Sequence, residues 1–182
     1  MDHRWVTPTE IAAVSLHDAA ALWSVGNRGA AQDVVRAACD ALVAGLDSPT
    51  LGMLASLSAR EADVEVPELL PIVLDELGLP SLPRGSAAGR EAVAAALAAQ
   101  LISGKITPRV LAGQAHQLFG HGLPLTQRLA ELDDEYDIIE YGDRTIDEVD
   151  ADVIAEARRL AGHRRAPADL QGSEDYPCEG QR

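Results

Sequence analysis

The residues most capable of chemistry lie between positions 131 and 152, where carboxylates greatly outnumber basic residues. Eleven Asp and Glu side chains accompany a single cation, Arg144, so the segment carries a local charge of −10. Negative charge steers basic partners toward a surface, and tyrosine is enriched among the residues that dominate binding energy. We therefore predict a docking surface for a basic protein partner, formed by Asp133, Asp134, Tyr136, Asp137, Glu140 and Tyr141. The alternative is a solvated helix face, because its four acidic members are positions that the apolar stripe leaves outside.

Pairs of carboxylates in the same segment could also ligate a metal ion. Glu131 with Glu135 and Asp133 with Asp137 are four residues apart and would share a helix face. Metal sites in helical bundles combine such residues with Glu-x-x-His pairs, and this pattern does not occur in the sequence. A calcium loop of the form Asp-x-Asp-x-Asp-Gly does not occur either. We therefore predict neither a bound metal nor another cofactor.

Two histidines, His116 and His121, stand close enough in the sequence to suggest a catalytic or metal-binding pair. Five residues of helix turn through about 500°, which would direct the two rings about 140° apart. Gly120 is expected to end the helix between them. We interpret His116 as a residue of the last helical turn, favourably placed in the helix dipole, and His121 as a loop residue.

No sequence motif supplies a nucleophile or a phosphate-binding loop, since GxSxG, Walker A and GxGxxG patterns are not found. Cys39 is expected on a buried apolar stripe with Val35, Leu42 and Leu46, where a thiol is inert. No catalytic residue is assigned, and a non-enzymatic protein is the leading hypothesis. The alternative is an enzyme or a metal-binding protein whose carboxylates and histidines converge only in the fold.

The overall charge and hydropathy restrict the classes of partner. Asp and Glu outnumber Lys and Arg by 29 to 15, which gives a net charge of −14 and opposes contact with nucleic-acid phosphates. No apolar run approaches the roughly 18 residues of a membrane-spanning helix, and the first residues lack the apolar region of an export signal. The two cysteines do not form a disulfide framework. We expect a cytoplasmic protein that binds neither nucleic acid nor membranes.

The elements that must position these residues are helices. Hydrophobic residues make up 47% of the chain but aromatic residues only 3%, and this bias toward alanine and leucine favours an all-α fold. Capping residues and apolar spacing predict about seven or eight helices, over residues 7–25, 30–46, 49–57, 69–77, 86–103, 107–120, 125–139 and 145–165. Residues 58–67 are predicted to be a loop. Residues 78–85, rich in Pro and Gly, are predicted to be a linker that could divide two helical layers.

The predicted domain is a single compact bundle over residues 1–165, followed by a disordered tail at 166–182. Within the bundle, the alanine-rich stretch from Glu91 to Leu101 suggests a further alternative for function. Small side chains let helices approach closely, so this face could pack against a second copy of the chain. A structural homo-oligomer therefore stays open as an interpretation.

Three stretches, residues 41–51, 76–80 and 102–108, resemble a group of small all-helical proteins of high-GC bacteria that has no assigned activity. The resemblance extends over about two thirds of the chain in layout and implies an all-helical fold, without carrying over any functional residue. The acidic, tyrosine-bearing surface is similar in type to that of immunity proteins that block nuclease toxins. This likeness implies an immunity, antitoxin or regulatory factor that binds a basic partner.

Overall fold

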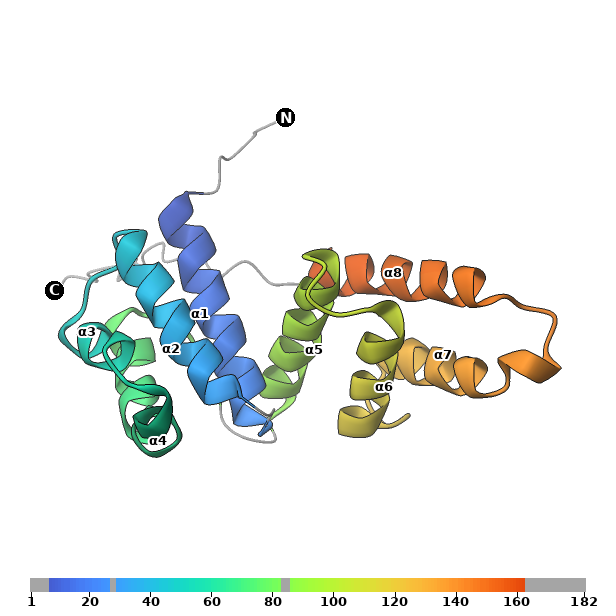
Figure 1. The fold of residues 1–182 in the computed structure, drawn as a ribbon, viewed down its shortest axis with the longest axis horizontal. Coiled ribbons are helices and arrows are strands. Elements are labelled where there is room, and N and C mark those ends of the chain that lie inside the picture. Colours follow the sequence, from blue (N-terminus) through green and yellow to red (C-terminus); the bar gives the residue numbers. More distant parts are fainter. Residues whose placement is uncertain (1–6, 27–28, 83–85, 163–182) are drawn as a thin grey trace, which may run out of the picture.

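The computed structural model describes residues 7–26, 29–82 and 86–162, and within these ranges the chain forms helices and no strands (Figure 1). The elements in chain order are α1 (Pro8–Ser24), α2 (Ala30–Val43), α3 (Pro49–Ala55), α4 (Ala59–Glu76), α5 (Ala87–Ile102), α6 (Pro108–Phe119), α7 (Gln127–Asp137), the 3-10 helix η1 (Ile139–Tyr141) and α8 (Ile146–Gly162). The predicted all-α fold is confirmed. Of the described helices, none combines the length and the apolar character needed to cross a bilayer. The tail predicted at 166–182 lies outside the described residues.

Side-chain caps begin several helices where the sequence predicts them. The hydroxyl oxygens of Thr7, Ser48 and Thr107 accept hydrogen bonds from backbone N–H groups three residues later, and a proline follows each of them. At the start of α8, Thr145 and Glu148 each accept a hydrogen bond from the other's backbone N–H. These local bonds satisfy N–H groups that the start of a helix leaves without partners. The starts of α1, α3, α6 and α8 could therefore be predicted from neighbouring residues alone.

Helix α2 buries a different face from the predicted one. Its buried residues are Ala30, Ala31, Val34, Ala37, Ala38 and Ala41. Cys39 and Leu42, which were expected in the core, are exposed. The helix ends at Val43, because Gly45 adopts a φ of 90° and the N–H of Leu46 returns to the carbonyl oxygen of Ala41. The small side chains allow close packing against α1, so alanines enter the core beside Val34, while Val35 and Leu46 are half-buried against it.

Helix α4 includes the segment predicted to be a loop. The N–H of Ser58 donates to Glu61 Oε2 at 2.8 Å in a capping box, so the helix begins at Ala59 and not near Leu69. Its buried stripe consists of Ala62, Val66, Leu70, Val73 and Leu74. Pro67 and Pro71 lie within the helix, one turn apart on the exposed face. A carbonyl oxygen that loses its N–H partner there can bind water, so the helix continues through both prolines.

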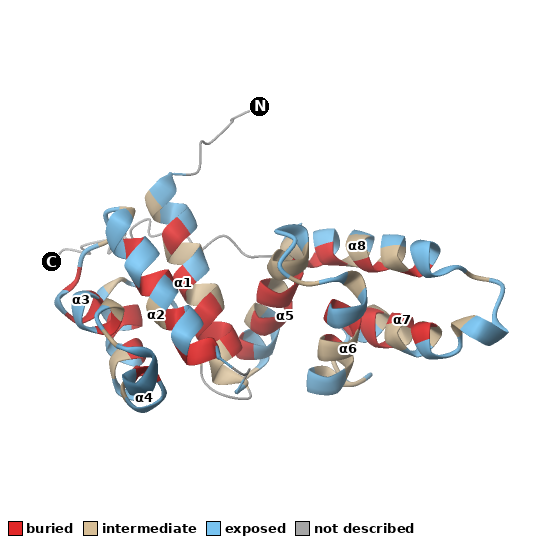
Figure 2. Ribbon diagram, in the orientation of Figure 1, coloured by how far each residue is buried: buried red, intermediate tan, exposed pale blue. Residues whose placement is uncertain are grey.

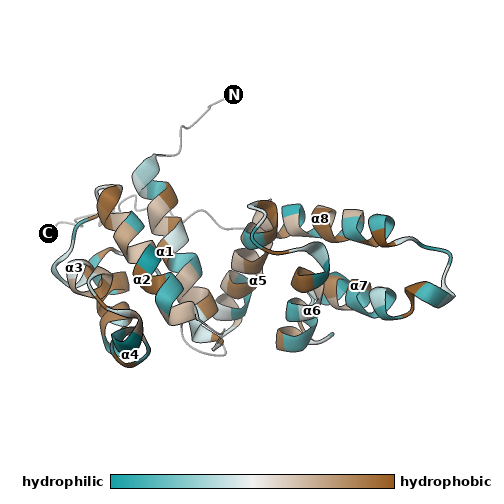
Figure 3. Cartoon of the chain, in the orientation of Figure 1, coloured by the Kyte–Doolittle hydropathy of each residue, from teal (hydrophilic) through white to brown (hydrophobic). Residues whose placement is uncertain are grey.

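The buried side chains form two clusters, one on either side of the linker at residues 78–85. The first contains residues of α1, α2, α3 and α4, and the second contains residues of α5, α6, α7 and α8. Helix α1 takes part in both, because Leu16 belongs to the first cluster and Leu22 to the second. Figure 2 shows the buried faces of each group turned toward one another, and Figure 3 shows hydrophobic residues along the same faces. Packing of α1 against α5 thus joins the two groups.

Helix α5 uses its small residues inside the chain. Ala94, Ala96 and Ala98 are buried, and the helix packs against α1, α6 and α8. Small side chains let these helix backbones approach closely, as expected from the sequence, but the neighbouring helices belong to the same chain. Most of the small side chains of this stretch are therefore covered by helices of the same chain, whereas Ala92, Ala95 and Ala99 are half-buried.

Candidate functional site

The acidic segment forms a helical hairpin at one end of the molecule. Helices α7 and α8 pack against each other, and η1 with residues 142–145 connects them. This connection reaches the end of the molecule opposite α3 and α4 (Figure 1). The carboxylates of the hairpin fall into three groups: those between α7 and α8, those beside the histidines of α6 and its following loop, and those around the connection.

Two arginines neutralise the carboxylates between α7 and α8. Arg128 lies 3.2 Å from Glu131, 3.0 Å from Glu135 and 3.5 Å from Asp152, measured between guanidinium nitrogen and carboxylate oxygen. Arg144 binds Glu135 as well, and it donates to Asp152 at 2.8 Å. The hydrogen bond from Arg144 lowers the pKa of the Asp152 carboxyl. These carboxylates hold the hairpin together, and their charge is largely compensated within the chain.

Tyr136, predicted as an exposed aromatic anchor, is a core residue. It is 2% exposed, and its hydroxyl donates a hydrogen bond to the carboxylate of Asp150 on α8. Burial, together with this hydrogen bond, raises the pKa of the Tyr136 phenol. The Arg109 guanidinium lies 5.2 Å from the ring centroid and also binds Asp137 at 3.2 Å. Tyr136 lies on the apolar stripe of α7, and that position buries its ring instead of presenting it to a partner.

The connection between α7 and α8 exposes apolar side chains among acidic ones. Tyr141 is 89% exposed, Ile138 is 61% exposed and Ile146 is 56% exposed. We call this region the hairpin tip; it comprises Asp137, Ile138, Glu140, Tyr141, Asp143, Ile146 and Asp147, all of them exposed. Sequence reasoning included Tyr141 but missed both isoleucines. The sequence could have predicted the exposure of Ile138, because Ile139 occupies the next position of the apolar stripe and leaves Ile138 outside it.

His116 and His121 lie together, contrary to the prediction that their rings diverge. The ring centroids are 4.9 Å apart in an edge-to-face arrangement. As predicted, His116 is in the last turn of α6 and His121 follows the helix. Gly120 has a φ of 56° and a ψ of −151°, so the chain leaves the helical path before His121. The helical rotation assumed in the prediction does not extend to His121, and the chain returns that ring to the end of α6.

Two adjacent aspartates of α7 contact these rings. Asp134 lies between them, with Oδ2 3.2 Å from His121 Nε2 and Oδ1 3.8 Å from His116 Nδ1. Asp133 Oδ2 is 3.0 Å from His116 Nδ1. The side chains of His116 and Asp133 are 29% and 23% exposed, whereas those of His121 and Asp134 are 51% and 56% exposed. We call these four residues the histidine cluster. Its inner side, His116 and Asp133, is mostly covered, and its outer side, His121 and Asp134, is open to solvent.

The two carboxylate pairs considered as metal ligands in the sequence bind basic side chains of the same chain. Glu131 and Glu135 both bind Arg128, on the side of α7 that faces α8. Asp133 contacts His116, whereas Asp137 binds Arg109. Glu131 and Glu135 thus do not join the histidines in a shared cleft, which was the arrangement expected for an enzyme. The carboxylates that do join the histidines are Asp133 and Asp134.

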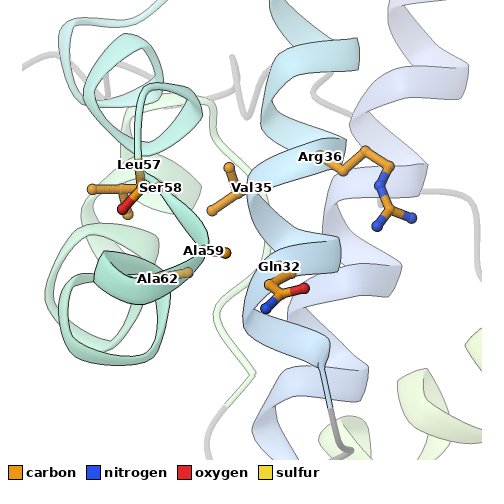
Figure 4. Close-up of a pocket in the computed structure, with 7 residues that line it drawn as sticks. All are labelled: Gln32, Val35, Arg36, Leu57, Ser58, Ala59 and Ala62. Atoms are coloured by element: carbon orange, nitrogen blue, oxygen red, sulfur yellow. The ribbon is translucent and has the colours of Figure 1, made fainter.

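A shallow pocket of about 190 Å³ lies between α2 and the start of α4, lined by Gln32, Val35, Arg36, Leu57, Ser58, Ala59 and Ala62 (Figure 4). Figure 4 shows Val35 directed toward Leu57 and Ala59, whereas Arg36 extends to the other side of α2. Sites for drug-sized ligands typically measure about 300 to 1,000 Å³. The pocket is small by that measure, so the hairpin remains the stronger candidate region.

No known protein family, no curated protein and no solved structure matches this chain significantly.

Proposed function

We propose that this chain is a protein-interaction module that binds a basic protein partner through the hairpin tip. The observation that carries the proposal is the exposure of Tyr141, Ile138 and Ile146 within nine residues, surrounded by acidic side chains. Large apolar side chains exposed together are typical of interaction sites, whereas scattered single ones are ordinary. The tip therefore has the composition expected of a small interface.

The positions of the carboxylates support a basic partner. Arg128 and Arg144 bind Glu135 and Asp152 between α7 and α8, whereas the exposed carboxylates of the hairpin tip lie outside this network. Acidic side chains around an apolar centre steer a positively charged surface toward the site and disfavour acidic partners. An exposed aromatic ring that becomes buried on binding contributes much of the binding energy. In this arrangement Tyr141 is the anchor, and Asp143 and Asp147 belong to the polar rim.

The proposal keeps Asp137, Glu140 and Tyr141 from the sequence-based docking surface and adds Ile138, Asp143, Ile146 and Asp147. Tyr136 leaves it because its ring is buried. Asp133 and Asp134 belong to the histidine cluster and do not contribute to the tip. The competing interpretation, a solvated helix face with no partner, gives no reason for the exposure of the tyrosine and the two isoleucines.

The test is site-specific photo-crosslinking from position 141 of the full chain in native lysate, followed by quantitative binding to the captured protein. We expect a basic partner whose affinity falls more than tenfold in Tyr141→Ala/Ile146→Ala, since loss of a hot-spot residue costs about 2 kcal/mol or more. Affinity should also fall between about 50 mM and 200 mM salt, because salt screens charge-driven contacts.

The matched control is Met53→Ala/Val64→Ala, which removes similarly exposed apolar side chains from α3 and α4, away from the tip. It should leave binding unchanged. Equal binding by the tip variant and the control variant would overturn the proposal, as would the failure to capture a stoichiometric partner at either salt concentration.

A further inference from the structure

We propose that His116, His121 and Asp134 form a binding site for a divalent transition-metal ion, with Asp133 positioning His116. One potential ligand atom from each of the three residues lies within 4.8 Å of the other two. Among the described residues, these are the three potential metal ligands (His, Cys, Asp or Glu) that lie this close together. The site is distinct from the hairpin tip and does not depend on the protein-interaction proposal.

The distances suit a tetrahedral ion. With metal bonds of about 2.0 to 2.2 Å, neighbouring ligand atoms in a tetrahedral site lie about 3.3 to 3.6 Å apart. Asp134 Oδ2 and His121 Nε2 are 3.2 Å apart, close to this range, and the potential ligand atoms of all three residues lie within 4.8 Å of one another. Side-chain adjustments would close the remaining separation around an ion.

The positions of the ligands follow from three separate features of the chain. The last turn of α6 presents His116, the turn at Gly120 returns His121, and α7 presents Asp134. Gly113 of α6 also faces Asp133, since a Cβ at this position would make van der Waals contact with Asp133 Oδ1 at 3.4 Å.

Asp133 completes the arrangement from the inner side. Its Oδ2 lies 3.0 Å from His116 Nδ1, and its side chain is less exposed than that of Asp134. Because Asp133 engages Nδ1, His116 would bind the metal through its other ring nitrogen, Nε2. A carboxylate that holds the non-ligating nitrogen fixes the orientation of the ring and is a regular companion of metal-bound imidazole. Asp133 is thus a positioning residue, and its loss should weaken metal binding less than the loss of a ligand.

The ligand types identify the class of metal. Two imidazoles and one carboxylate suit Zn²⁺, Co²⁺, Ni²⁺ or Cu²⁺, whereas Ca²⁺ and Mg²⁺ prefer sites made of oxygen atoms. The negative charge of the hairpin also raises the local concentration of cations. Because His121 and Asp134 are about half exposed, water has access to a fourth coordination position.

The experiment is calorimetric titration of the chelator-treated full chain with Zn²⁺, together with Co²⁺ titration followed by visible absorption. We expect one equivalent of either metal to bind, with the Co²⁺ spectrum of a tetrahedral site. His121→Ala and Asp134→Asn should each weaken binding more than tenfold, and Asp133→Asn should weaken it by less than these ligand variants do. Zn²⁺ should also raise the Tm of the wild-type chain but not that of His121→Ala, since a ligand specific for the folded state stabilises it.

The matched control is Asp143→Asn, which removes the same charge as Asp134→Asn at another exposed position of the acidic segment. It should bind metal within about twofold of wild type. His121 is half exposed, so its replacement should leave the fold intact, and circular dichroism can check this. A chain that binds neither Zn²⁺ nor Co²⁺ stoichiometrically, or that binds them equally well with and without His121, would overturn the proposal.

Discussion

Tyr136 and Tyr141 are five positions apart and have opposite environments. Tyr136 is 2% exposed and donates its hydroxyl hydrogen to Asp150, whereas Tyr141 is 89% exposed at the hairpin tip. The first hydroxyl joins α7 to α8, because its acceptor lies on the neighbouring helix. The same type of residue thus packs in the core at position 136 and is exposed for contact with a partner at position 141.

Tyr136→Phe should lower the free energy of unfolding by about 1 to 2 kcal/mol, because it removes a hydrogen bond to a charged acceptor while keeping the buried ring. Urea denaturation measures the change. Tyr141→Phe is the control, and it should leave stability unchanged because the Tyr141 side chain is exposed. Equal stability of the two variants would show that the hydrogen bond to Asp150 contributes nothing to the fold.

At the scale of the element, α4 shows how burial on one face tolerates unfavourable residues on the other. Its apolar stripe from Ala62 to Leu74 packs into the first cluster, and its two prolines lie on the exposed face. A proline inside a helix removes one backbone hydrogen bond and costs about 3 kcal/mol relative to alanine. Burial of the stripe and the capping box at Ser58 offset that cost.

Pro67→Ala should therefore stabilise the protein, by about 1 kcal/mol or more, since it restores an N–H donor in the middle of α4 and removes a steric clash. Helical content, measured by circular dichroism, should not fall, and the urea midpoint should rise. Loss of stability on this substitution would contradict a continuous helix, because a proline in a loop stabilises through the unfolded state.

At the scale of the whole molecule, carboxylates join elements in both clusters. In the first, Glu76 at the end of α4 accepts hydrogen bonds from the hydroxyl and the backbone N–H of Thr50 in α3, at 2.8 Å and 3.2 Å. In the second, Asp152 binds both Arg144 and Arg128. The hydrogen bonds from Thr50 lower the pKa of Glu76, as the hydrogen bond from Arg144 lowers that of Asp152.

The lowered pKa values predict that the protein loses stability in acid. A carboxyl with a lower pKa in the folded state binds fewer protons there than in the unfolded state, so its contribution is present above the unfolded pKa. That contribution disappears as the pH falls through the folded pKa. We expect the urea midpoint to be constant near neutral pH and to fall below about pH 4.5, the region in which unfolded carboxyls titrate.

Glu76→Gln should reduce this dependence on pH, because the substituted residue no longer titrates. The double variant Glu76→Gln/Asp152→Asn should reduce it further, since Glu76 is bonded to Thr50 and Asp152 to Arg144 and Arg128, so the two carboxyls share no partner among these contacts. A wild-type urea midpoint that stays constant down to about pH 3 would contradict the assignment of these two pKa values.

The sequence by itself determined the class of fold and many helix starts, because helices and their caps depend on residues three or four positions apart. Thr7, Ser48, Thr107 and Thr145 cap helices through contacts with near neighbours. The prediction failed for α4, where the cap at Ser58 indicates the start of a helix but Pro67 indicates a break. Which of the two signals dominates depends on which face of the helix is buried.

Only the tertiary structure decided which candidate residues meet. The Tyr136 hydroxyl finds Asp150 as its acceptor, and Arg128 reaches Asp152, 24 residues away, because α8 packs on α7. The histidines meet because Gly120 interrupts the helical rotation, and Asp133 and Asp134 join them from α7. Contacts between separate helices depend on how those helices pack, and no spacing within a single helix encodes that packing.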